Sequence, residues 1–462
     1  MPATAQPSPV RPGAATRPRT GSSRPWVITG MITVFMMINF ADKSVLGLSA
    51  VPIMHQFHLS DSSYGLLASS FFFFLLFGVS GVAAGFVSRR VASRWVLFAL
   101  AVGWAVAQLP LLFAATVPSL VVGRVLLGAA EGPASPLSMH ALYDWFPADR
   151  RSLPSALQVA GGGVGTFLAA PVLTWIITNH GWRSAFLALA VGAALWAALW
   201  LCIGGDGPRA TAPVPAAASP KIPAAASAAV SASPGGLQLR TLRPLLTSGT
   251  VLGGLAAAFG AYWALTVGSA WLPAYLHART GESPATAATV VSLGAALNVT
   301  LILTVVPYTG RLMRRGVSSR WALGLLQGLT VLVSGACMAA FPFVSSGALR
   351  TVLITVAFGA AGLTFPLSYL TAAEIVPPQH RGTVFAISTA ISTLPGIIAP
   401  ATTGALIDHF GYRTAFTTAG VLMLLAGAYA AFAIRPQHDR DRLIQPRPGN
   451  SRPAQLEADQ AP

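Results

Sequence analysis

Apolar runs of about 20 residues recur along most of the chain, and they constrain its fold more than any other feature. A helix of this length crosses a hydrocarbon core roughly 30 Å thick. Only helices and closed barrels can satisfy their backbone hydrogen bonds in lipid. Barrel strands would alternate polar and apolar residues, whereas residues 71–77 and 421–432 are apolar on every side. The sequence therefore predicts an all-α membrane protein.

The apolar runs predict twelve membrane-spanning helices, arranged as two six-helix bundles at residues 26–204 and 248–434. Residues 205–247, rich in Pro, Ala and Ser, predict a flexible cytoplasmic linker between the bundles. Residues 1–25 and 435–462 are expected to be disordered cytoplasmic tails. The predicted helices are 26–50, 63–88, 94–116, 119–143, 152–178, 183–204, 248–276, 285–308, 320–343, 348–373, 382–408 and 413–434.

The uneven distribution of positive charge predicts the orientation of the chain in the membrane. With both termini cytoplasmic, 23 of the 29 Lys and Arg residues lie on the cytoplasmic side, as the positive-inside rule requires. The same distribution argues against nucleic acid as a partner, although the net charge is +16. We therefore expect a multi-pass protein of the inner or plasma membrane, and the Arg-rich, Lys-poor composition suggests a bacterial source.

A sequence repeat relates the two predicted bundles. The segment Gly181-Trp-Arg-Ser-Ala-Phe186 recurs as Gly411-Tyr-Arg-Thr-Ala-Phe416, an offset of 230 residues. Two six-helix units in the same orientation form a parallel repeat, and such a pair encloses a cavity at the middle of the membrane. The same offset pairs Pro147 with Pro377, Arg151 with Arg381, and Asp144 with Glu374.

The loop between the second and third predicted helices carries the basic motif Gly85-Phe-Val-Ser-Arg-Arg-Val-Ala-Ser-Arg94, and a second copy begins at Gly310. The motif resembles that of the Major Facilitator Superfamily, in which an Asp usually stands where this chain has Arg89 and Arg314. Two interpretations remain open for these arginines, a charge-paired cytoplasmic gate and ordinary positive-inside anchors. The predicted gate residues are Arg89, Arg90, Asp144, Arg314, Arg315 and Glu374.

The fourth predicted helix carries a longer motif, Gly123-Arg-Val-Leu-Leu-Gly-Ala-Ala-Glu-Gly-Pro133, which is followed by Trp145-Phe-Pro147. Together with Asn39-Phe-Ala-Asp-Lys43 in the first helix, it resembles the anion:cation symporter family. The resemblance covers most of residues 26–435. It implies the major facilitator fold and the transport of sugar acids, phthalate, sialic acid or similar carboxylates.

Four charged residues, Asp42, Lys43, Arg124 and Glu131, lie inside predicted membrane helices. A charge at the centre of such a helix costs roughly 2.5–3.5 kcal/mol on insertion scales, so its presence favours a functional role. The repeat offset places no charged residue at the equivalent positions of the second bundle. A role in helix packing should serve both bundles alike, whereas energy coupling needs one set of charges. The asymmetry therefore favours function.

The family resemblance gives each charged residue a role. It assigns Asp42 and Glu131 to proton coupling, Lys43 to binding the substrate anion, and Arg124 to charge pairing with the acid of the first helix. Burial disfavours the charged form of a carboxyl group and a nearby cation favours it, so Asp42 and Glu131 can exchange protons as the cavity changes sides. Adjacent residues on a helix point about 100° apart, so Asp42 and Lys43 need different partners.

The remaining cavity positions depart from those of sugar-acid carriers. Phe40, Phe77, Gly162 and Thr389 stand where the family often has Tyr, Tyr, Gln and Asn, and this change predicts a less hydroxylated carboxylate, aromatic or short-chain. For each polar candidate the alternative interpretation is helix packing, in which Ser and Thr are common. The polar and aromatic candidates are Tyr262, Trp263, Thr266, Ser368, Tyr369, Ser388, Thr389, Ser392 and Thr393.

These features predict a proton-driven symporter that takes up an organic anion by alternating access, with a proton-coupled exporter of drugs or metabolites as the alternative. Sodium coupling is less favoured, because no cage of oxygen ligands is evident. No catalytic motif, metal cluster or cofactor-binding motif is recognisable, so we expect no enzyme activity and no cofactor. One chain supplies a whole pathway, which suggests a functional monomer. Its expected partners are the small organic anion, protons and the lipid bilayer.

Overall fold

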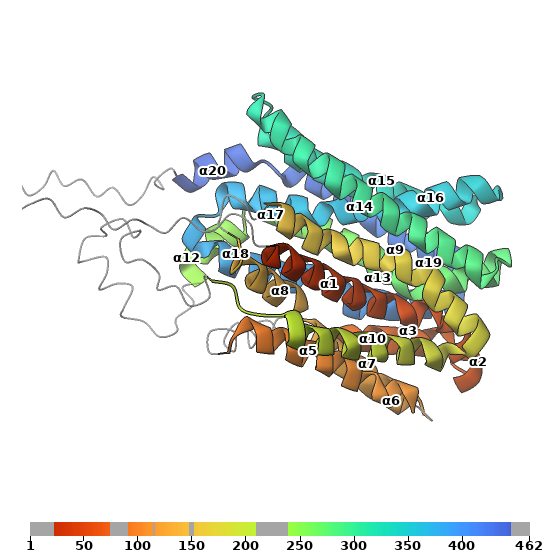
Figure 1. Ribbon diagram of the computed structural model, residues 1–462. Coiled ribbons are helices and arrows are strands. Elements are labelled where there is room, and N and C mark those ends of the chain that lie inside the picture. The colour runs from red at the N-terminus through yellow and green to blue at the C-terminus, as the bar shows by residue number, and fades with distance from the viewer. Residues whose placement is uncertain (1–22, 74–90, 114–115, 147–151, 209–238, 445–462) are drawn as a thin grey trace, which may run out of the picture.

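The computed structural model describes residues 23–73, 91–113, 116–146, 152–208 and 239–444, and all regular structure in these residues is helical. The helices run roughly side by side in one elongated bundle, with α5, α7 and α10 along one side in Figure 1 and α14, α15 and α16 along the other. The first half contains α1 (Arg24–Leu48), α2 (Ala50–Phe57), α3 (Asp61–Phe73), α5 (Ser93–Ala107), α6 (Leu109–Leu112), α7 (Val117–Glu131), α8 (Ala134–Tyr143), α9 (Ser152–His180) and α10 (Trp182–Ile203).

The second half consists of long helices with short irregular turns of helix between them. Its elements are α12 (Leu239–Leu246), α13 (Gly249–Thr280), α14 (Pro284–Arg314), the π-helix η3 (Arg320–Leu325), α15 (Leu326–Ala340), the 3-10 helix η4 (Phe341–Phe343), α16 (Gly347–Gly359), the 3-10 helix η5 (Ala361–Leu363), α17 (Thr364–Ile375), α18 (Pro378–Ser392), α19 (Pro395–Ala433) and α20 (Pro436–Ile444).

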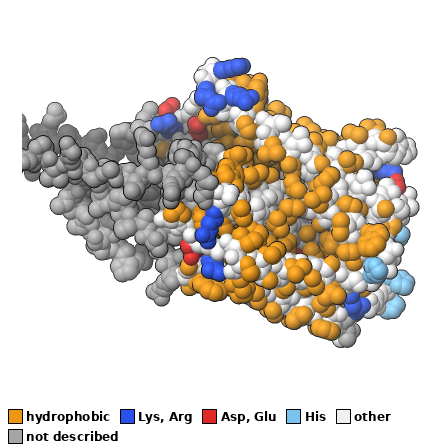
Figure 2. Space-filling view, in the orientation of Figure 1, with side chains coloured by type: hydrophobic (Ala, Val, Ile, Leu, Met, Phe, Trp, Pro, Cys, Tyr) orange, Lys and Arg blue, Asp and Glu red, His pale blue; other side chains and the backbone are white. Residues whose placement is uncertain are grey.

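Every predicted span coincides with helix over its described residues, which agrees with the expected all-α fold. Among the described residues, nine helical segments are long and apolar enough to cross a membrane, so the predicted number of twelve stays a prediction. Hydrophobic side chains cover most of the face visible in Figure 2 between the two ends of the bundle, and the Lys and Arg side chains visible on this face lie near the ends. A surface of this kind suits a lipid environment.

The repeated segment identified in the sequence has the same backbone geometry in both halves. Gly181 lies between α9 and α10 with φ 84° and ψ 160°, and Gly411 lies inside α19 with φ 78° and ψ 168°. These dihedral angles are essentially restricted to glycine, and each glycine sharply redirects the chain between two helical segments. The two halves therefore share a local structure as well as a sequence motif.

Small residues allow α15 and α19 to pack closely. A Cβ atom on Gly420 would lie 2.7 Å from the carbonyl oxygen of Gly335, and one on Gly427 would lie 3.0 Å from that of Gly328. Distances of this size leave no room for a larger side chain. Close backbone approach of this kind is the usual way in which membrane helices gain packing energy, because lipid provides no hydrophobic drive for their association.

The two halves of the chain touch at one end of the bundle. We call the end where α1 and α13 begin the proximal end, and the opposite end, where α2 and the start of α3 lie, the distal end (Figure 1). Near the distal end, a Cβ atom on Gly65 of α3 would lie 2.5 Å from the carbonyl oxygen of Pro400 in α19. The indole of Trp271 in α13 donates a hydrogen bond to the same oxygen at 3.0 Å. These contacts close the distal end.

Two short helices occupy segments in which the sequence predicts no regular structure. The helix α12 lies in the predicted linker 205–247, and its Leu242 and Leu245 are buried in an apolar cluster with Ile375 and Val384. The helix α20 lies in the predicted tail 435–462. Tertiary contacts stabilise both segments, since isolated helices of eight or nine residues are marginal in water.

Candidate functional site: buried charges beside a hydroxyl-lined pocket

An ion pair between the first and fourth predicted helices lies at the centre of the candidate site. The Nζ of Lys43 in α1 lies 3.0 Å from Oε2 of Glu131, the last residue of α7. The Glu131 side chain is fully buried, whereas 19% of the Lys43 side chain is exposed. Removing either partner would leave an uncompensated charge inside the protein, which typically costs about 3–5 kcal/mol. The pair therefore restrains the packing of α1 against α7.

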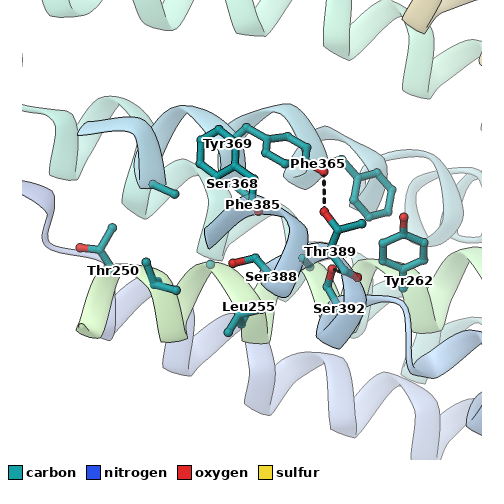
Figure 3. A pocket seen from close by; sticks show the side chains of 14 residues that line it. Thr250, Leu255, Tyr262, Phe365, Ser368, Tyr369, Phe385, Ser388, Thr389 and Ser392 are labelled. Atoms are coloured by element: carbon teal, nitrogen blue, oxygen red, sulfur yellow. Dashed lines mark hydrogen bonds between the residues drawn. The ribbon is translucent and has the colours of Figure 1, made fainter. Parts of the chain in front are cut away.

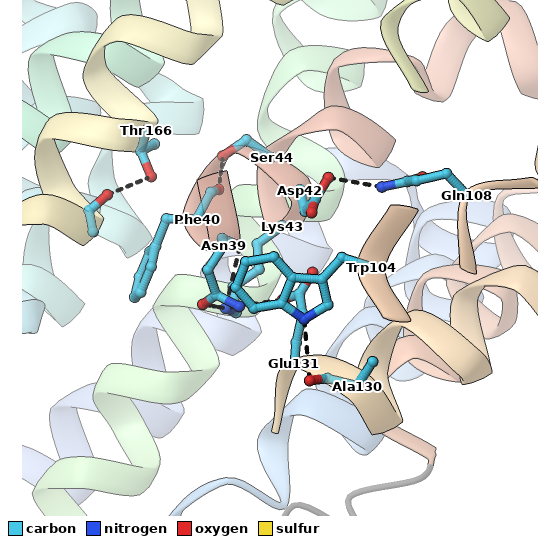
Figure 4. A network of polar contacts seen from close by, with 11 residues as sticks. Asn39, Phe40, Asp42, Lys43, Ser44, Trp104, Gln108, Ala130, Glu131 and Thr166 are labelled. Atoms are coloured by element: carbon cyan, nitrogen blue, oxygen red, sulfur yellow. Dashed lines mark hydrogen bonds and ion pairs between the residues drawn. The ribbon is translucent and has the colours of Figure 1, made fainter. Parts of the chain in front are cut away.

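Further contacts surround the Lys43 ammonium on its own helix. It donates hydrogen bonds to the side-chain and backbone oxygens of Asn39, one turn earlier in α1, and it lies 4.5 Å from the centre of the Phe40 ring (Figure 4). A cation over an aromatic face gains about 0.5–2 kcal/mol. Since Lys43 has only three N–H donors, an incoming anion would compete with Asn39 and Glu131 for them.

Asp42 has a different partner from Lys43, in agreement with the different directions predicted for these neighbours. Its Oδ1 accepts a hydrogen bond of 2.8 Å from Nε2 of Gln108, and both side chains are buried (Figure 4). Gln108 lies between α5 and α6, where Pro110 supplies no backbone N–H to continue the helix. This interruption in the third predicted helix places the amide of Gln108 against α1.

Arg124, on α7, is 3% exposed and completes the cluster of buried charges. It is close enough to act electrostatically on both Asp42 and Glu131, and Tyr64 of α3 lies near it. The four charged residues predicted to carry coupling and anion binding therefore form one cluster in the first half of the chain. Their individual roles stay predictions.

A pocket in the second half presents hydroxyl groups. It has a volume of about 80 Å³, and α13, α17 and α18 supply its walls (Figure 3). None of its lining residues is charged. Because ligand pockets usually measure about 300–1,000 Å³, this one can hold only part of a small organic molecule. The lining residues with hydroxyl groups are Thr250, Tyr262, Ser368, Tyr369, Ser388, Thr389 and Ser392.

Hydrogen bonds among these hydroxyl groups fix part of the pocket wall. The Tyr369 and Thr389 hydroxyl groups lie 2.9 Å apart and join α17 to α18 (Figure 3). Ser368 accepts a hydrogen bond of 2.5 Å from the amide of Gln327 in α15. The hydroxyl groups of Thr250, Ser368 and Ser392 already donate their one hydrogen to oxygen atoms of the protein, so in this arrangement they can only accept from a ligand.

The end of the pocket formed by Tyr262 lies at a depth similar to that of the charged cluster. The helices α1 and α13 run in the same direction and meet where Gly47 contacts the backbone of Ser269 (Figure 1). Lys43 lies four residues before Gly47, and Tyr262 lies seven residues before Ser269. At 1.5 Å per residue, the two side chains differ in depth by roughly 5 Å along parallel helices.

Six of the predicted cavity residues line this pocket, namely Tyr262, Ser368, Tyr369, Ser388, Thr389 and Ser392. Three others are buried outside it: Trp263, Thr266 and Thr393. The hydroxyl groups of Thr266 and Thr393 donate to backbone carbonyls of their own helices, as those of the pocket residues Ser368 and Ser392 also do.

Phe40 and Gly162, which stand where the family has other binding residues, lie against each other. A Cβ atom on Gly162 of α9 would lie 2.8 Å from the ring of Phe40, so the ring occupies the space of a larger side chain at that position. The predicted cavity residue Phe77 lies outside the described residues.

The predicted gate is described only in part, because Arg89 and Arg90 lie outside the described residues. Arg314 and Arg315, at the end of α14, are exposed. Within the described part of the chain, no ion pair joins either of them to Glu374. Asp144 follows α8, and its carbonyl group packs against Gly207. Both interpretations of Arg314 and Arg315, as gate residues and as positive-inside anchors, stay predictions.

A carboxylate of the second half caps a helix of the first half at the distal end. Asp408 of α19 accepts hydrogen bonds from the backbone N–H groups of Asp61 at 3.0 Å and Ser62 at 2.8 Å, and from the Ser62 hydroxyl group. These N–H groups lie in the first turn of α3 and have no acceptor within the helix itself, so a negative charge is favourable there. Burial, followed by the charge of Asp408, raises the pKa of the Asp61 carboxyl group to about 6.

Replacing Asp61 by asparagine should stabilise the protein in a pH-dependent manner. Because the folded-state pKa of Asp61 lies above the ordinary value, the stability contributed by its protonated form is fully present only below about pH 4, and it is lost as the pH rises from there through about 6. Asp61→Asn should therefore raise the melting temperature by about 2 °C at pH 8 and by much less at pH 4. Thermal unfolding of the purified protein would measure this. The exposed control Asp441→Asn should give similar shifts at both pH values, and an equal response of Asp61→Asn would contradict the assignment.

A multi-pass helical bundle with a cluster of charges buried between its helices has the features of a secondary transporter. A family model of the Major Facilitator Superfamily matches residues 32–400 and 328–458, and the chain belongs to that superfamily. This confirms the family expected from the loop motifs, and the family and its relatives are transporters and not enzymes.

Curated relatives extend over most of the chain. It is 26% identical over 417 residues to the hexuronate transporter of Bacillus subtilis (strain 168), which covers 87% of this chain and 92% of the relative. It is 25% identical over 417 residues to the probable sulfoacetate transporter of Cupriavidus necator, covering 89% and 94%. These relatives confirm the resemblance to carriers of sugar acids and other organic anions.

Solved structures support the same fold. A bacterial homologue of the human lysosomal transporter Spinster, in an inward-facing and occupied conformation, superposes with a TM-score of 0.73. The alignment covers 91% of this chain and 99% of that structure at 18% sequence identity. At this identity the likeness concerns the fold alone.

Two residues of the site, Gln108 and Thr250, are not among the residues predicted from the sequence. Gln108 and Thr250 are polar residues within or beside apolar runs. In such runs a charged residue indicates a functional role more strongly than an uncharged one. A search for every amide side chain inside a predicted span would have found Gln108. Thr250 lies near the start of α13, where a hydroxyl residue is common for reasons of capping, so its place in a pocket had no distinguishing signal.

Proposed function

We propose that the protein is a proton-coupled symporter that takes up an organic anion by alternating access. The observation that supports this most directly is the Lys43–Glu131 ion pair, in which a partly exposed cation is held by a fully buried carboxylate. An anion that binds Lys43 weakens the hold of Lys43 on Glu131. Without its cation, the buried carboxylate takes up a proton more readily. Anion binding and proton uptake thereby favour each other, as symport requires.

The hydroxyl-lined pocket supports a substrate with hydrogen-bonding groups beyond the carboxylate. Its seven hydroxyl-bearing residues provide hydrogen-bonding groups. Phe40 and Gly162, which stand where the family often has Tyr and Gln, provide none from their side chains. We therefore place hexuronates, which the Bacillus subtilis relative is named for, beside the aromatic or short-chain acids suggested by the sequence. In this arrangement Lys43 binds the carboxylate and the pocket hydroxyl groups bind the remainder of the molecule.

The proposed function is tested by thermal shift and uptake with a panel of acids at pH 5.5 and 7.5. The panel contains D-glucuronate, D-galacturonate, sulfoacetate, acetate and benzoate. A substrate should raise the melting temperature, because a ligand that binds the folded state stabilises it. Uptake of the same acid into proteoliposomes should increase when the outside is more acidic than the inside.

The alternative, a proton-coupled exporter, predicts other results. Lipophilic cations would then stabilise the protein, and the acids would not. An acidic lumen would drive the cation into inverted vesicles. The positive charges of Lys43 and Arg124 in the cluster favour an anion over a cation.

A further inference from the structure

A hydrogen bond between two almost fully buried side chains joins Gln108 to Asp42 in the charged cluster. Nε2 of Gln108 lies 2.8 Å from Oδ1 of Asp42, and the two side chains are 1% and 0% exposed. The backbone holds Gln108 in place, since its carbonyl group accepts hydrogen bonds from Leu111 and Leu112 at 3.0 Å. The amide therefore approaches α1 from a fixed position at the break between α5 and α6.

Each member of this pair has a second side-chain polar atom, an oxygen, that lacks a partner among the described residues. Within the described part of the chain, Oε1 of Gln108 and Oδ2 of Asp42 are buried and accept no hydrogen bond. Buried polar atoms are nearly always paired, so orphaned acceptors on both sides of one contact require an explanation. A carboxylate can only accept hydrogen bonds, whereas a protonated carboxyl group also donates one.

A primary amide suits both forms of a carboxyl group. Its N–H₂ group donates to the carboxylate, and a half-turn of the amide brings its oxygen to the same place to accept an O–H. No movement of a helix is needed for this exchange. Ser and Thr hydroxyl groups could do the same, but a Lys or Arg at this position would stabilise only the charged form.

We propose that Gln108 is a positioning residue for the proton-carrying step at Asp42, donating to the carboxylate and accepting from the protonated carboxyl group. The inference rests on the proposed function, in which Asp42 gains a proton on one side of the membrane and loses it on the other. No bond other than the O–H of Asp42 is made or broken. Gln108 keeps Asp42 hydrogen-bonded both as the carboxylate and as the protonated carboxyl group, so Asp42 can gain a proton and also release it.

The other groups that act on Asp42 are all charged. Lys43 follows it on α1, and Arg124 and Glu131 face it from α7. Their net effect on Asp42 changes when a substrate anion binds Lys43 or when Glu131 takes up a proton. The amide of Gln108 is neutral, so its hydrogen bond is the one contribution that persists through such changes.

The test is a pH titration of the purified, full-length protein by infrared difference spectroscopy, which detects the carbonyl band of a protonated carboxyl group. The band that disappears in Asp42→Asn belongs to Asp42. Gln108→Met keeps the length of the side chain and removes both hydrogen-bonding groups. Both forms of Asp42 then lose a hydrogen bond, but the bond to the carboxylate is charge-assisted and about twice as strong as the bond from the neutral carboxyl group. The midpoint of the Asp42 band should therefore move to higher pH by about one unit, a tenfold change in the proton dissociation constant.

Gln158→Met is the matched control. Gln158 is equally buried, it also has an Oε1 without a partner in the described chain, and its amide donates to the neutral Ser138 at 3.0 Å. This variant should leave the Asp42 midpoint unchanged. If Gln108→Met does not purify as a folded protein, Gln108→Leu is the second variant, and the same shift is expected.

Three outcomes would overturn the inference. One is an unchanged midpoint in folded Gln108→Met or Gln108→Leu, and another is an equal shift in Gln158→Met, which would indicate a packing effect. The third is the lack of any Asp42 band over the accessible pH range. The titration uses no substrate, so a shift in Gln108→Met combined with no transported acid would reject the proposed function and leave the pairing of Gln108 with Asp42 intact.

Discussion

Replacing Lys43 by methionine is expected to lower the affinity for the transported acid by about 100-fold, or about 3 kcal/mol. Methionine keeps the apolar part of the side chain and removes the charge that the proposed function assigns to anion binding. The variant also leaves Glu131 fully buried without its cation at 3.0 Å. The melting temperature should therefore fall as well, because an unpaired buried charge is costly.

A double variant separates the two effects. In Lys43→Met/Glu131→Gln both charges are absent, so the melting temperature should return close to that of the wild type. Binding should stay lost, since the anion still has no partner at position 43. Isothermal titration calorimetry with D-galacturonate, or with another acid that stabilises the wild type, measures the affinity. Recovery of binding in the double variant would mean that Lys43 only neutralises Glu131, and the anion-binding role would be rejected.

The second large effect is expected for Glu131→Gln, which cannot carry a proton. A gradient of two pH units supplies about 2.7 kcal/mol per proton, enough for up to about 100-fold accumulation by a one-proton symporter. Wild-type proteoliposomes with an acidic exterior should approach this value. The Glu131→Gln variant should reach only equal concentrations inside and outside. Exchange of labelled for unlabelled acid without a gradient should continue, because the substrate still binds Lys43.

The matched control is Glu282→Gln. Glu282 also forms an ion pair, with Arg350 at 3.4 Å, but its side chain is 32% exposed and lies at the distal end, away from the cluster. This variant should accumulate the acid as the wild type does. Tenfold or greater accumulation by Glu131→Gln would exclude Glu131 as the required proton carrier and leave that role to Asp42.

Much of the fold could be predicted because its signals are local. The length of each apolar run is set by the thickness of the membrane, and the helices therefore appear where hydropathy places them. The repeat of Gly181 at Gly411 is also local, since a positive φ is tolerated by few other residues. The predictions of irregular structure for 205–247 and 435–462 missed α12 and α20, because contacts with distant helices stabilise these short segments.

The candidate site was predictable as a set of residues but not as a set of contacts. The sequence indicated that Asp42 and Lys43 need different partners, because neighbours on a helix point in different directions. It gave no means of choosing Gln108 for one and Glu131 for the other. The hydroxyl residues of the second half are candidates on sequence grounds, but sequence alone does not separate those that line the pocket from Thr266 and Thr393, which are buried outside it.

The sequence by itself determined that this chain is a helical membrane protein with two related halves, and that the charged residues of the first and fourth helices have no charged equivalents in the second half. These properties depend on the solubility of each segment in lipid and on short motifs. The tertiary structure alone decided which charges meet, which hydroxyl groups share a pocket, and that Asp408 caps α3 to close the distal end. Such contacts depend on how each helix is rotated about its axis and how deeply it is set. Packing among many helices fixes both.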